Sequence, residues 1–175
     1  MDGYKHFRKD RQGRRGGCVA LYVRECSDVT ELMAGDNKVE SLWVKTRGRS
    51  DKSDILVGVC YRWLNQDEEI DEVFYKHLAE AARSPALVLM GNFNFPDIRR
   101  KYNLVQKKQS RRFLECMEDN FLMQLVREPT RGSAPLDLLF TNREGLEGDV
   151  EVGGCLGQSD HNMVEFSIQI GRAHV

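Results

Sequence analysis

The chain has 175 residues, of which 41% are hydrophobic and 30% are charged, and its formal net charge is −1. A chain of this kind fits one globular domain with a sizeable core, and it has no strong overall cationic field to attract nucleic acid. Its five cysteines show no CxxC spacing, which argues against a zinc site and a disulfide framework. No apolar run approaches the roughly 20 residues of a membrane span, and the start lacks a secretory signal. We therefore expect an intracellular protein, nuclear or cytoplasmic, with no membrane partner.

The chain begins with a basic segment, residues 1–16, which we separate from the expected domain at 17–170 and a short tail at 171–175. Six Lys or Arg side chains and two Asp side chains lie within the first 15 residues, so the local charge is 6 − 2 = +4. Two interpretations stay open: a solvated tail, and a contact with nucleic-acid phosphates through side chains such as Arg14 and Arg15.

Apolar and β-branched runs bounded by glycine or polar clusters predict β-strands along most of the chain. These runs are residues 18–23, 39–46, 55–61, 86–90, 136–141, 150–152 and 163–170. The first three follow one another closely, and we expect them to pair antiparallel in sequence order.

Two segments between the strands have helical periodicity. In residues 67–82, Ile70, Phe74 and Leu78 recur at helical spacing behind an acidic beginning that suits the helix dipole. Residues 110–120 place apolar side chains on one face and charged ones around the other. Strands and helices therefore alternate through the middle of the chain.

Two carboxylates and an imidazole near the end of the chain indicate phosphodiester chemistry. Asp137 lies in an apolar run, and Asp160 and His161 follow Ser159. A carboxylate such as Asp137 would fix the tautomer of His161 and favour an imidazolium that donates to a phosphate oxygen, while Asp160 would bind a metal ion. A single His beside an Asp is more often a surface or turn pair. The combination of Asp137, Asp160 and His161 is what favours a catalytic site.

The ordered segments CYRWLN, LMGNFNFPDI, PTRGSAPLDLLFTN and GQSDHNMVEFSI resemble the motifs of the endonuclease/exonuclease/phosphatase superfamily. Together with GRRGGCVALYVRE and VESLWVK, they are most similar to the endonuclease domain of non-LTR retrotransposons of the chicken-repeat and jockey type, which accompanies a reverse transcriptase. The resemblance covers roughly residues 3–169. It implies an α/β (α+β) fold, a four-layer sandwich of two packed, mostly antiparallel β-sheets flanked by helices, with the site among loops at one edge.

The resemblance also assigns roles to individual residues. Tyr61 would face the phosphate, with Arg62 as a nearby nucleic-acid contact, although a strand-end aromatic is an equally good interpretation of Tyr61. In the family's Gly-Asp-Phe-Asn motif the two polar residues orient and polarise the attacking water, and these positions fall on Asn92 and Asn94.

The C-terminal motifs match the family fully. Asp137 corresponds to the carboxylate paired with the catalytic histidine, His161 to that histidine, and Asp160 to the metal-linked aspartate. The cofactor implied is Mg²⁺ and the partner implied is DNA. Further basic candidates for DNA contact are Arg99 and Arg100.

Two departures lead us to expect a chain with little or no activity. Asn92 stands where the family has Asp, and an amide cannot act as a base near neutral pH. Relatives also begin with a further strand and a Gln-Glu-Thr segment whose glutamate is the main metal ligand, and neither motif is found here. We interpret Glu25 and Glu40 as solvent-facing, and we expect the absent strands to expose a sheet edge that invites self-association.

Three hypotheses follow for the function. The first is a Mg²⁺-dependent DNA endonuclease that nicks one strand, which we expect to be disabled here. The second is a non-catalytic remnant, a pseudoenzyme that contacts nucleic acid through residues 5–15, 99–101 and Arg111–Arg112. The third is a mobile-element fragment without a selected role. A phosphatase acting on inositol phosphates is a remote alternative.

Overall fold

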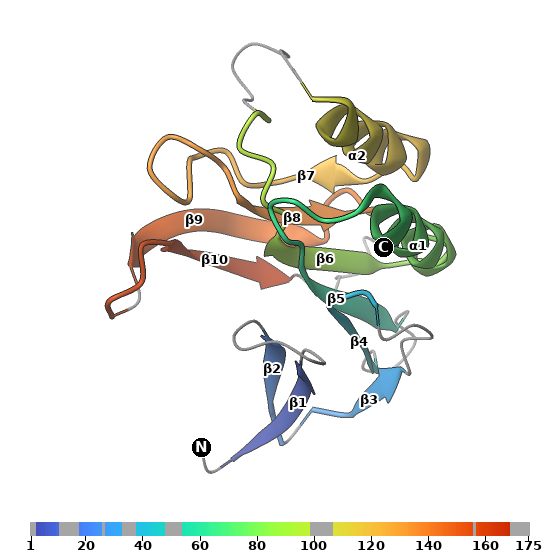
Figure 1. Cartoon of the computed structure of the whole chain (residues 1–175). Helices are drawn as coiled ribbons and strands as arrows, with labels where there is room; N and C mark the ends of the chain where they lie inside the picture. Colours follow the sequence, from blue (N-terminus) through green and yellow to red (C-terminus); the bar gives the residue numbers. More distant parts are fainter. Residues whose placement is uncertain are drawn as a thin grey trace.

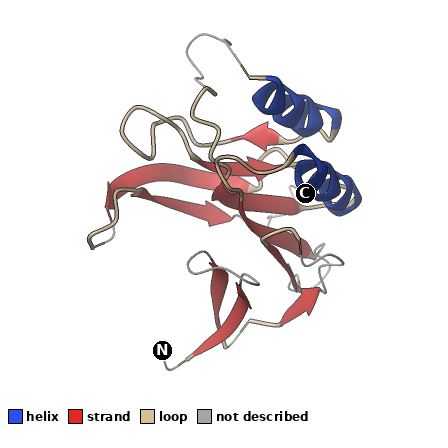
Figure 2. Cartoon of the chain, viewed as in Figure 1, coloured by secondary structure: helices blue, strands red, loops and turns tan. Residues whose placement is uncertain are grey.

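A central six-stranded β-sheet organises the chain in a computed structural model (Figure 1). Two helices cover one face of this sheet and two β-hairpins pack on the other, as the colouring by secondary structure shows (Figure 2). The structure describes residues 3–10, 18–25, 27–32, 38–47, 54–98, 107–155 and 157–168.

The central sheet has the strand order β3-β4-β5-β6-β8-β7. The strands are β3 (Val29–Leu32), β4 (Ser41–Thr46), β5 (Ile55–Tyr61), β6 (Leu87–Asn92), β7 (Met123–Gln124) and β8 (Asp137–Thr141). Only β5 and β6 pair in parallel, because helix α1 (Glu68–Ala81) carries the chain back across the sheet between them. The inner strands are covered on both faces, which is why their sequences are almost continuously apolar.

Two hairpins form the second layer. β1 (Tyr4–Asp10) pairs with β2 (Cys18–Arg24), and β9 (Glu147–Cys155) pairs with β10 (Asn162–Ile168). Along β10 partly buried and exposed residues alternate, as expected for strands with one face on a core. The inner faces of both hairpins pack against a cluster of Val, Ile and Leu side chains on the underside of the central sheet.

Aromatic rings fill the space between the sheet and the helices α1 and α2 (Lys108–Asp119). The rings of Phe93 and Phe113 lie 5.0 Å apart, and Phe140 contacts both at 5.9 Å in edge-to-face geometry. Edge-to-face packing suits the ring quadrupoles and adds to the burial of apolar area. The helices contribute apolar side chains at the spacing seen in the sequence, including Phe74 and Leu78 from α1.

Helix α2 is capped from outside its own sequence. Its N-cap position is Lys107, whose side chain cannot accept a hydrogen bond. Asp97 takes this role: one carboxylate oxygen accepts from the Ser110 hydroxyl at 2.6 Å and the other from the Lys107 amide at 3.0 Å. Burial raises the pKa of Asp97, but these two hydrogen bonds outweigh it and hold the pKa below its usual range.

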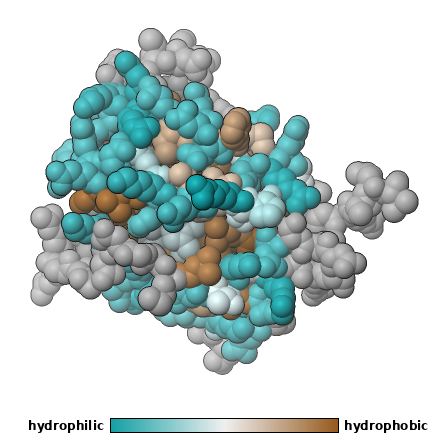
Figure 3. Space-filling view, turned by 90° about the vertical axis from the view of Figure 1, so that its right-hand side faces the viewer, coloured by the Kyte–Doolittle hydropathy of each residue, from teal (hydrophilic) through white to brown (hydrophobic). Residues whose placement is uncertain are grey.

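The surface is mostly hydrophilic on the face shown in Figure 3, with a smaller hydrophobic area near its middle. Large exposed hydrophobic residues are spread over different elements, among them Tyr22, Leu64, Phe121 and Met163. The edge strands of the central sheet, β3 and β7, have only four and two residues, and short edge strands limit pairing with other chains. The self-association expected from an exposed edge stays a prediction.

The sequence predicted the α/β class, two packed layers of sheet and both helices, and these are confirmed. Both described helices lie on the same face of the central sheet, so the described residues form three layers.

Three strands were missed: β1, β3 and β7. The basic segment is therefore not simply a tail, because its residues 4–10 pair with β2. The expected pairing of the first three strands was wrong in part, since β2 joins β1 and not the central sheet.

Candidate functional site

Three predicted site residues lie side by side where neighbouring strands of the central sheet meet the loops. Tyr61 ends β5 and is paired in register with Asn92, which ends β6. Asn92 is in turn paired with Asp137, which begins the antiparallel strand β8. The close approach of β5 and β6 depends on Gly91, because a Cβ atom there would collide with the backbone carbonyl of Cys60.

The loop after β6 turns sharply so that Asn94 points back toward the strand ends. Phe93 and Phe95 on either side of it are buried in the aromatic core. Asn94 has a positive φ of 50°, a conformation that asparagine tolerates better than most residues. Its amide N–H donates to the Asn92 side-chain oxygen at 3.0 Å, and its side-chain nitrogen donates to the Arg62 carbonyl at 2.7 Å. The side-chain oxygen of Asn92 therefore holds the loop in place, at the position where the resemblance expects a group that orients the attacking water.

A buried ion pair supports this loop from the helix side. Arg62 is only 4% exposed and donates two hydrogen bonds, of 2.9 and 2.8 Å, to the two carboxylate oxygens of Asp71 in α1. Its guanidinium also lies 4.0 Å from the ring centroid of Phe95. The charge of Arg62 is therefore buried and positions the loop, and its predicted contact with nucleic acid stays a prediction.

Thr130 fixes the start of β8. Its side chain is fully buried, and its hydroxyl oxygen accepts hydrogen bonds from the backbone amides of Leu136 and Asp137 at 3.1 and 3.0 Å. Its carbonyl accepts from the Asn162 amide at 2.7 Å, which ties the beginning of β10 to the same loop. One residue thus sets the positions of both Asp137 and the neighbour of His161.

His161 and Asp137 form the ion pair expected from the sequence. The Nδ1 atom of His161 lies 2.7 Å from Asp137 Oδ2, and both side chains are 25% exposed. A carboxylate at this distance assigns the proton to Nδ1, so that Nε2 faces away from Asp137. The backbone amide of His161 donates to the Ser159 hydroxyl at 3.1 Å, which holds the turn before β10.

Asp160 does not have the surroundings of a metal ligand. Its carboxylate is two-thirds exposed and pairs with Arg131 at 2.6 Å, and it lies 3.9 Å from His161 Nε2. Within the described ranges, no three His, Cys, Asp or Glu side chains gather as a metal site. Asn92 adds no negative charge, and Asp137 is bound to the imidazole. These donors do not fit the Mg²⁺ ion that the resemblance implies, because Mg²⁺ favours carboxylates that are free to coordinate.

Glu40 was expected to face solvent, and the structure places it against the candidate site. Its Oε1 atom accepts from the Trp63 indole at 2.7 Å, and its carbonyl accepts from the Tyr61 amide at 2.9 Å. The ring of Trp63 packs edge-on against Tyr61 at 5.1 Å. No local sequence pattern indicates this contact, because Glu40 precedes β4, Trp63 follows β5, and the two residues are 23 positions apart. Glu25 is exposed as expected.

Most predicted basic contacts cannot be placed at the site. Arg14, Arg15, Arg99 and Arg100 lie outside the described residues. Arg111 is exposed on α2, and Arg112 pairs with Glu72 of α1. Arg131, which was not predicted, is the described arginine that pairs with Asp160 beside His161. In the described part of the chain no helix is long and apolar enough to cross a membrane.

The geometry permits hydrogen bonding to an anion at the strand ends. The Nε2 atom of His161 and the phenol of Tyr61 are groups that hydrogen-bond to phosphate oxygens, and the Asp137 carboxylate orients the imidazole through Nδ1. Among the described residues at this edge, Asn92 is neutral, Asp137 contacts His161, Asp160 pairs with Arg131, and Glu40 accepts from the Trp63 indole.

Known structures with the same fold confirm the resemblance at the level of fold. The endonuclease domain of TRAS1, a telomere-specific non-LTR retrotransposon, is similar with a TM-score of 0.74 and 15% identity, covering 98% of this chain and 83% of that one. A 3′ phosphatase, NExo, from Neisseria, solved bound to a product DNA hairpin, gives a TM-score of 0.69 and 17% identity over 95% of this chain and 80% of that one. An endonuclease/exonuclease/phosphatase family protein from Leptotrichia buccalis gives 0.62 and 16%, with 97% and 72% covered. No family model and no curated protein matches the sequence.

Proposed function

We propose that this chain is an endonuclease-like domain that binds the phosphodiester backbone of DNA but hydrolyses it weakly or not at all. Its fold is shared with nucleases and phosphatases, including a retrotransposon endonuclease domain, which supports phosphodiester chemistry as the ancestral activity. The observation that carries the proposal is that a neutral Asn92 side chain stands at the end of β6 and is used to hold the neighbouring loop. Its side-chain oxygen accepts from the Asn94 amide and holds the loop.

The binding half of the proposal depends on His161. The Asp137 carboxylate contacts Nδ1 and orients the ring, so that Nε2 is the ring atom that faces a bound phosphate oxygen, to which it donates when the ring is an imidazolium. Tyr61 and Asn94 lie at the same edge and add hydrogen-bonding groups around it. Arg131 supplies a positive charge next to His161 when a phosphate displaces Asp160 from it.

The catalytic half is impaired by the neutral amide at position 92. General-base catalysis contributes roughly 10²- to 10⁴-fold in rate, and an amide cannot supply it. The described carboxylates at the site also contact other partners: Asp137 contacts His161, Asp160 pairs with Arg131, and Glu40 accepts from the Trp63 indole. Mg²⁺, the cofactor implied by the resemblance, has no fitting set of ligands among the described residues.

A plasmid-nicking assay tests the catalytic half. Purified protein is incubated with supercoiled plasmid and Mg²⁺ beside the His161→Ala variant. We expect the two proteins to give the same background of nicked plasmid. The Asn92→Asp variant should also stay at this background, because it restores a carboxylate but leaves Asp160 bound to Arg131. Nicking by the unchanged chain well above His161→Ala would show that the proposed inactivity is wrong.

A binding titration tests the other half. We expect a short DNA duplex to shift the NMR signals of His161 and of the Asn94 side-chain amide at low salt, and the affinity to fall as salt rises. His161→Ala should weaken binding, whereas His77→Ala, which alters a histidine of α1, should not. If DNA produces no saturable shift at low salt, or if both variants bind equally well, the binding proposal fails.

A further inference from the structure

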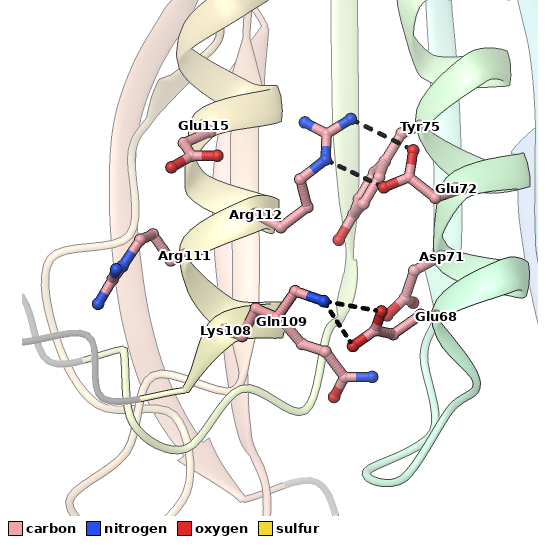
Figure 4. A pocket seen from close by; sticks show the side chains of 9 residues that line it. All are labelled: Glu68, Asp71, Glu72, Tyr75, Lys108, Gln109, Arg111, Arg112 and Glu115. Carbon is pink, nitrogen blue, oxygen red and sulfur yellow. Dashed lines mark hydrogen bonds and ion pairs between the residues drawn. The ribbon is translucent and has the colours of Figure 1, made fainter.

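A cavity of about 340 Å³ opens between helices α1 and α2 (Figure 4). Its two sides have opposite charge. Glu68, Asp71 and Glu72 come from α1, and Lys108, Arg111, Arg112 and Glu115 come from α2. Asp71 is already paired with Arg62, so Glu68 and Glu72 form the acidic wall, and Lys108, Arg111 and Arg112 outnumber Glu115 on a mainly basic wall opposite it.

The two walls are joined at two points by exposed ion pairs. Lys108 Nζ lies 3.3 Å from Glu68 Oε2, and Arg112 Nε lies 3.0 Å from Glu72 Oε1. Arg112 lies four residues after Lys108 in α2, and Glu72 lies four residues after Glu68 in α1. The two helices therefore run side by side in the same direction. Exposed ion pairs of this kind contribute little stability, so a ligand with the same charges can replace them at small cost.

The floor of the cavity holds a polar group that lacks a partner. Tyr75 is 5% exposed, and its hydroxyl has no hydrogen-bond partner among the described residues. Figure 4 shows the hydroxyl end of Tyr75 pointing into the space between the helices. Burial, and then the charge of Asp71, raise the pKa of Tyr75, so the hydroxyl keeps its proton and can donate. Buried tyrosine hydroxyls usually have a partner, and the cavity is where one would lie.

We propose that this cavity binds a small zwitterion of amino-acid size, with its ammonium group against Glu68 and Glu72 and its carboxylate against Lys108 and Arg112. The Tyr75 hydroxyl hydrogen-bonds to the bound molecule. A ligand with only one charge would satisfy one wall and leave the other wall facing it with the wrong sign. The opposite charges of the two helices thus select for a molecule that carries both charges.

Titration of the full chain with L-glutamine, followed by NMR of the backbone amides of α1 and α2, tests the proposal. We expect saturable shifts at Tyr75 and Arg112 at millimolar ligand. Tyr75→Phe removes only the hydroxyl and should weaken binding by about tenfold, while the melting temperature of the free protein stays the same or rises. Tyr4→Phe, on the exposed face of β1, is the matched control and should change neither quantity.

Two further measurements separate the site from general charge effects. Acetate and methylammonium, each with one of the two charges, should give no saturable shift at the same concentrations. Lys108→Gln, on the exposed rim, should also weaken L-glutamine binding and does not depend on replacing a buried residue. The proposal is overturned if L-glutamine gives no saturable shift, or if the single-charge ions act equally well. It is also overturned if Tyr75→Phe lowers the melting temperature of the free protein, since its hydroxyl would then already have a partner.

Discussion

Two acidic residues that follow one another in α1, Asp71 and Glu72, have very different surroundings. Asp71 is 3% exposed and shares both carboxylate oxygens with the buried Arg62. The side chain of Glu72 is 47% exposed and pairs with Arg112 at the surface. The same charge therefore has a structural role at one position and little effect at the next.

Replacing each carboxylate by an amide measures this difference. We expect Asp71→Asn to lower the free energy of unfolding by about 3–5 kcal/mol, because it leaves the Arg62 charge buried without its partner. Glu72→Gln, with the same change of charge on the same helix, should cost about 0–1 kcal/mol. Urea denaturation of both variants makes the comparison, and equal losses would contradict the role assigned to the buried pair.

Thr130 is a positioning residue whose loss should also be measurable. Thr130→Val keeps the shape but removes the oxygen that accepts from two buried backbone amides, so we expect a loss of about 1–3 kcal/mol. Thr30→Val, at an exposed position of β3, should stay within about 0.5 kcal/mol of the unchanged protein. Chemical denaturation compares the two, and a Thr130→Val protein as stable as the control would refute the role of this hydroxyl.

The residues at the site differ in how far the sequence could predict them. Asp137 and His161 carry chemistry in their side chains and belong to recognisable motifs, and the structure brings them together at 2.7 Å. Thr130 and Arg62 act through backbone amides and a buried charge, which depend on contacts between distant segments. Such roles leave no local pattern in the sequence, and so they were missed or misassigned.

At the scale of an element, the cap of α2 depends on Asp97, which lies ten residues before the N-cap residue Lys107. Asp97→Ala removes the acceptors for the Ser110 hydroxyl and the Lys107 amide, and we expect a loss of about 0.5–2 kcal/mol at neutral pH. Asp119→Ala, at the exposed end of the same helix, serves as the control and should have an effect below about 0.5 kcal/mol.

The pH dependence of this cap has a definite sign. The pKa of Asp97 is lower in the folded protein than the value of about 3.9 in an unfolded chain, so its contribution is present above that value. It is lost as the pH falls through the folded-state pKa. The difference in stability between the unchanged protein and Asp97→Ala should therefore be full at neutral pH and shrink below about pH 4. Thermal melts from pH 3 to pH 7 would show this, and a constant difference would contradict it.

The strands that the sequence missed have a common physical reason. β1 is rich in Lys and Arg, and its outward residues are exposed, so it lacks an apolar alternation strong enough to stand out. β3 and β7 are short edge strands held by their neighbours more than by their own composition. The strands that were found, such as β5 and β8, are buried on both faces and read as apolar runs.

At the scale of the whole molecule, the hairpin β9–β10 is joined to the central sheet by side-chain packing and a few contacts at the site. We expect Phe166→Ala, which removes an inward ring, to speed hydrogen exchange throughout β9 and β10 while leaving β4 and β5 protected. Met163→Ala, at an exposed position of β10, is the control and should leave exchange unchanged. Mass spectrometry of exchanged peptides reads this out, and uniform acceleration across the sheet would mean that the hairpin does not open independently.

The fold class could be predicted from the sequence, whereas the pairing of the strands could be predicted only in part. Apolar periodicity and motif order predicted the class, and the shared fold of known endonuclease and phosphatase structures bears this out. Which strands pair with one another depends on long-range packing. The pairing of β2, which joins β1 and not the central sheet, was therefore predicted wrongly.

The partners of the Asp137–His161 contact come from different layers, since one residue begins a strand of the central sheet and the other precedes a strand of the separate hairpin. A slide of one layer over the other by a single residue, about 3.3 Å, would break this contact. The NMR signals of the His161 imidazole should therefore report whether the hairpin and the central sheet are correctly aligned in any variant.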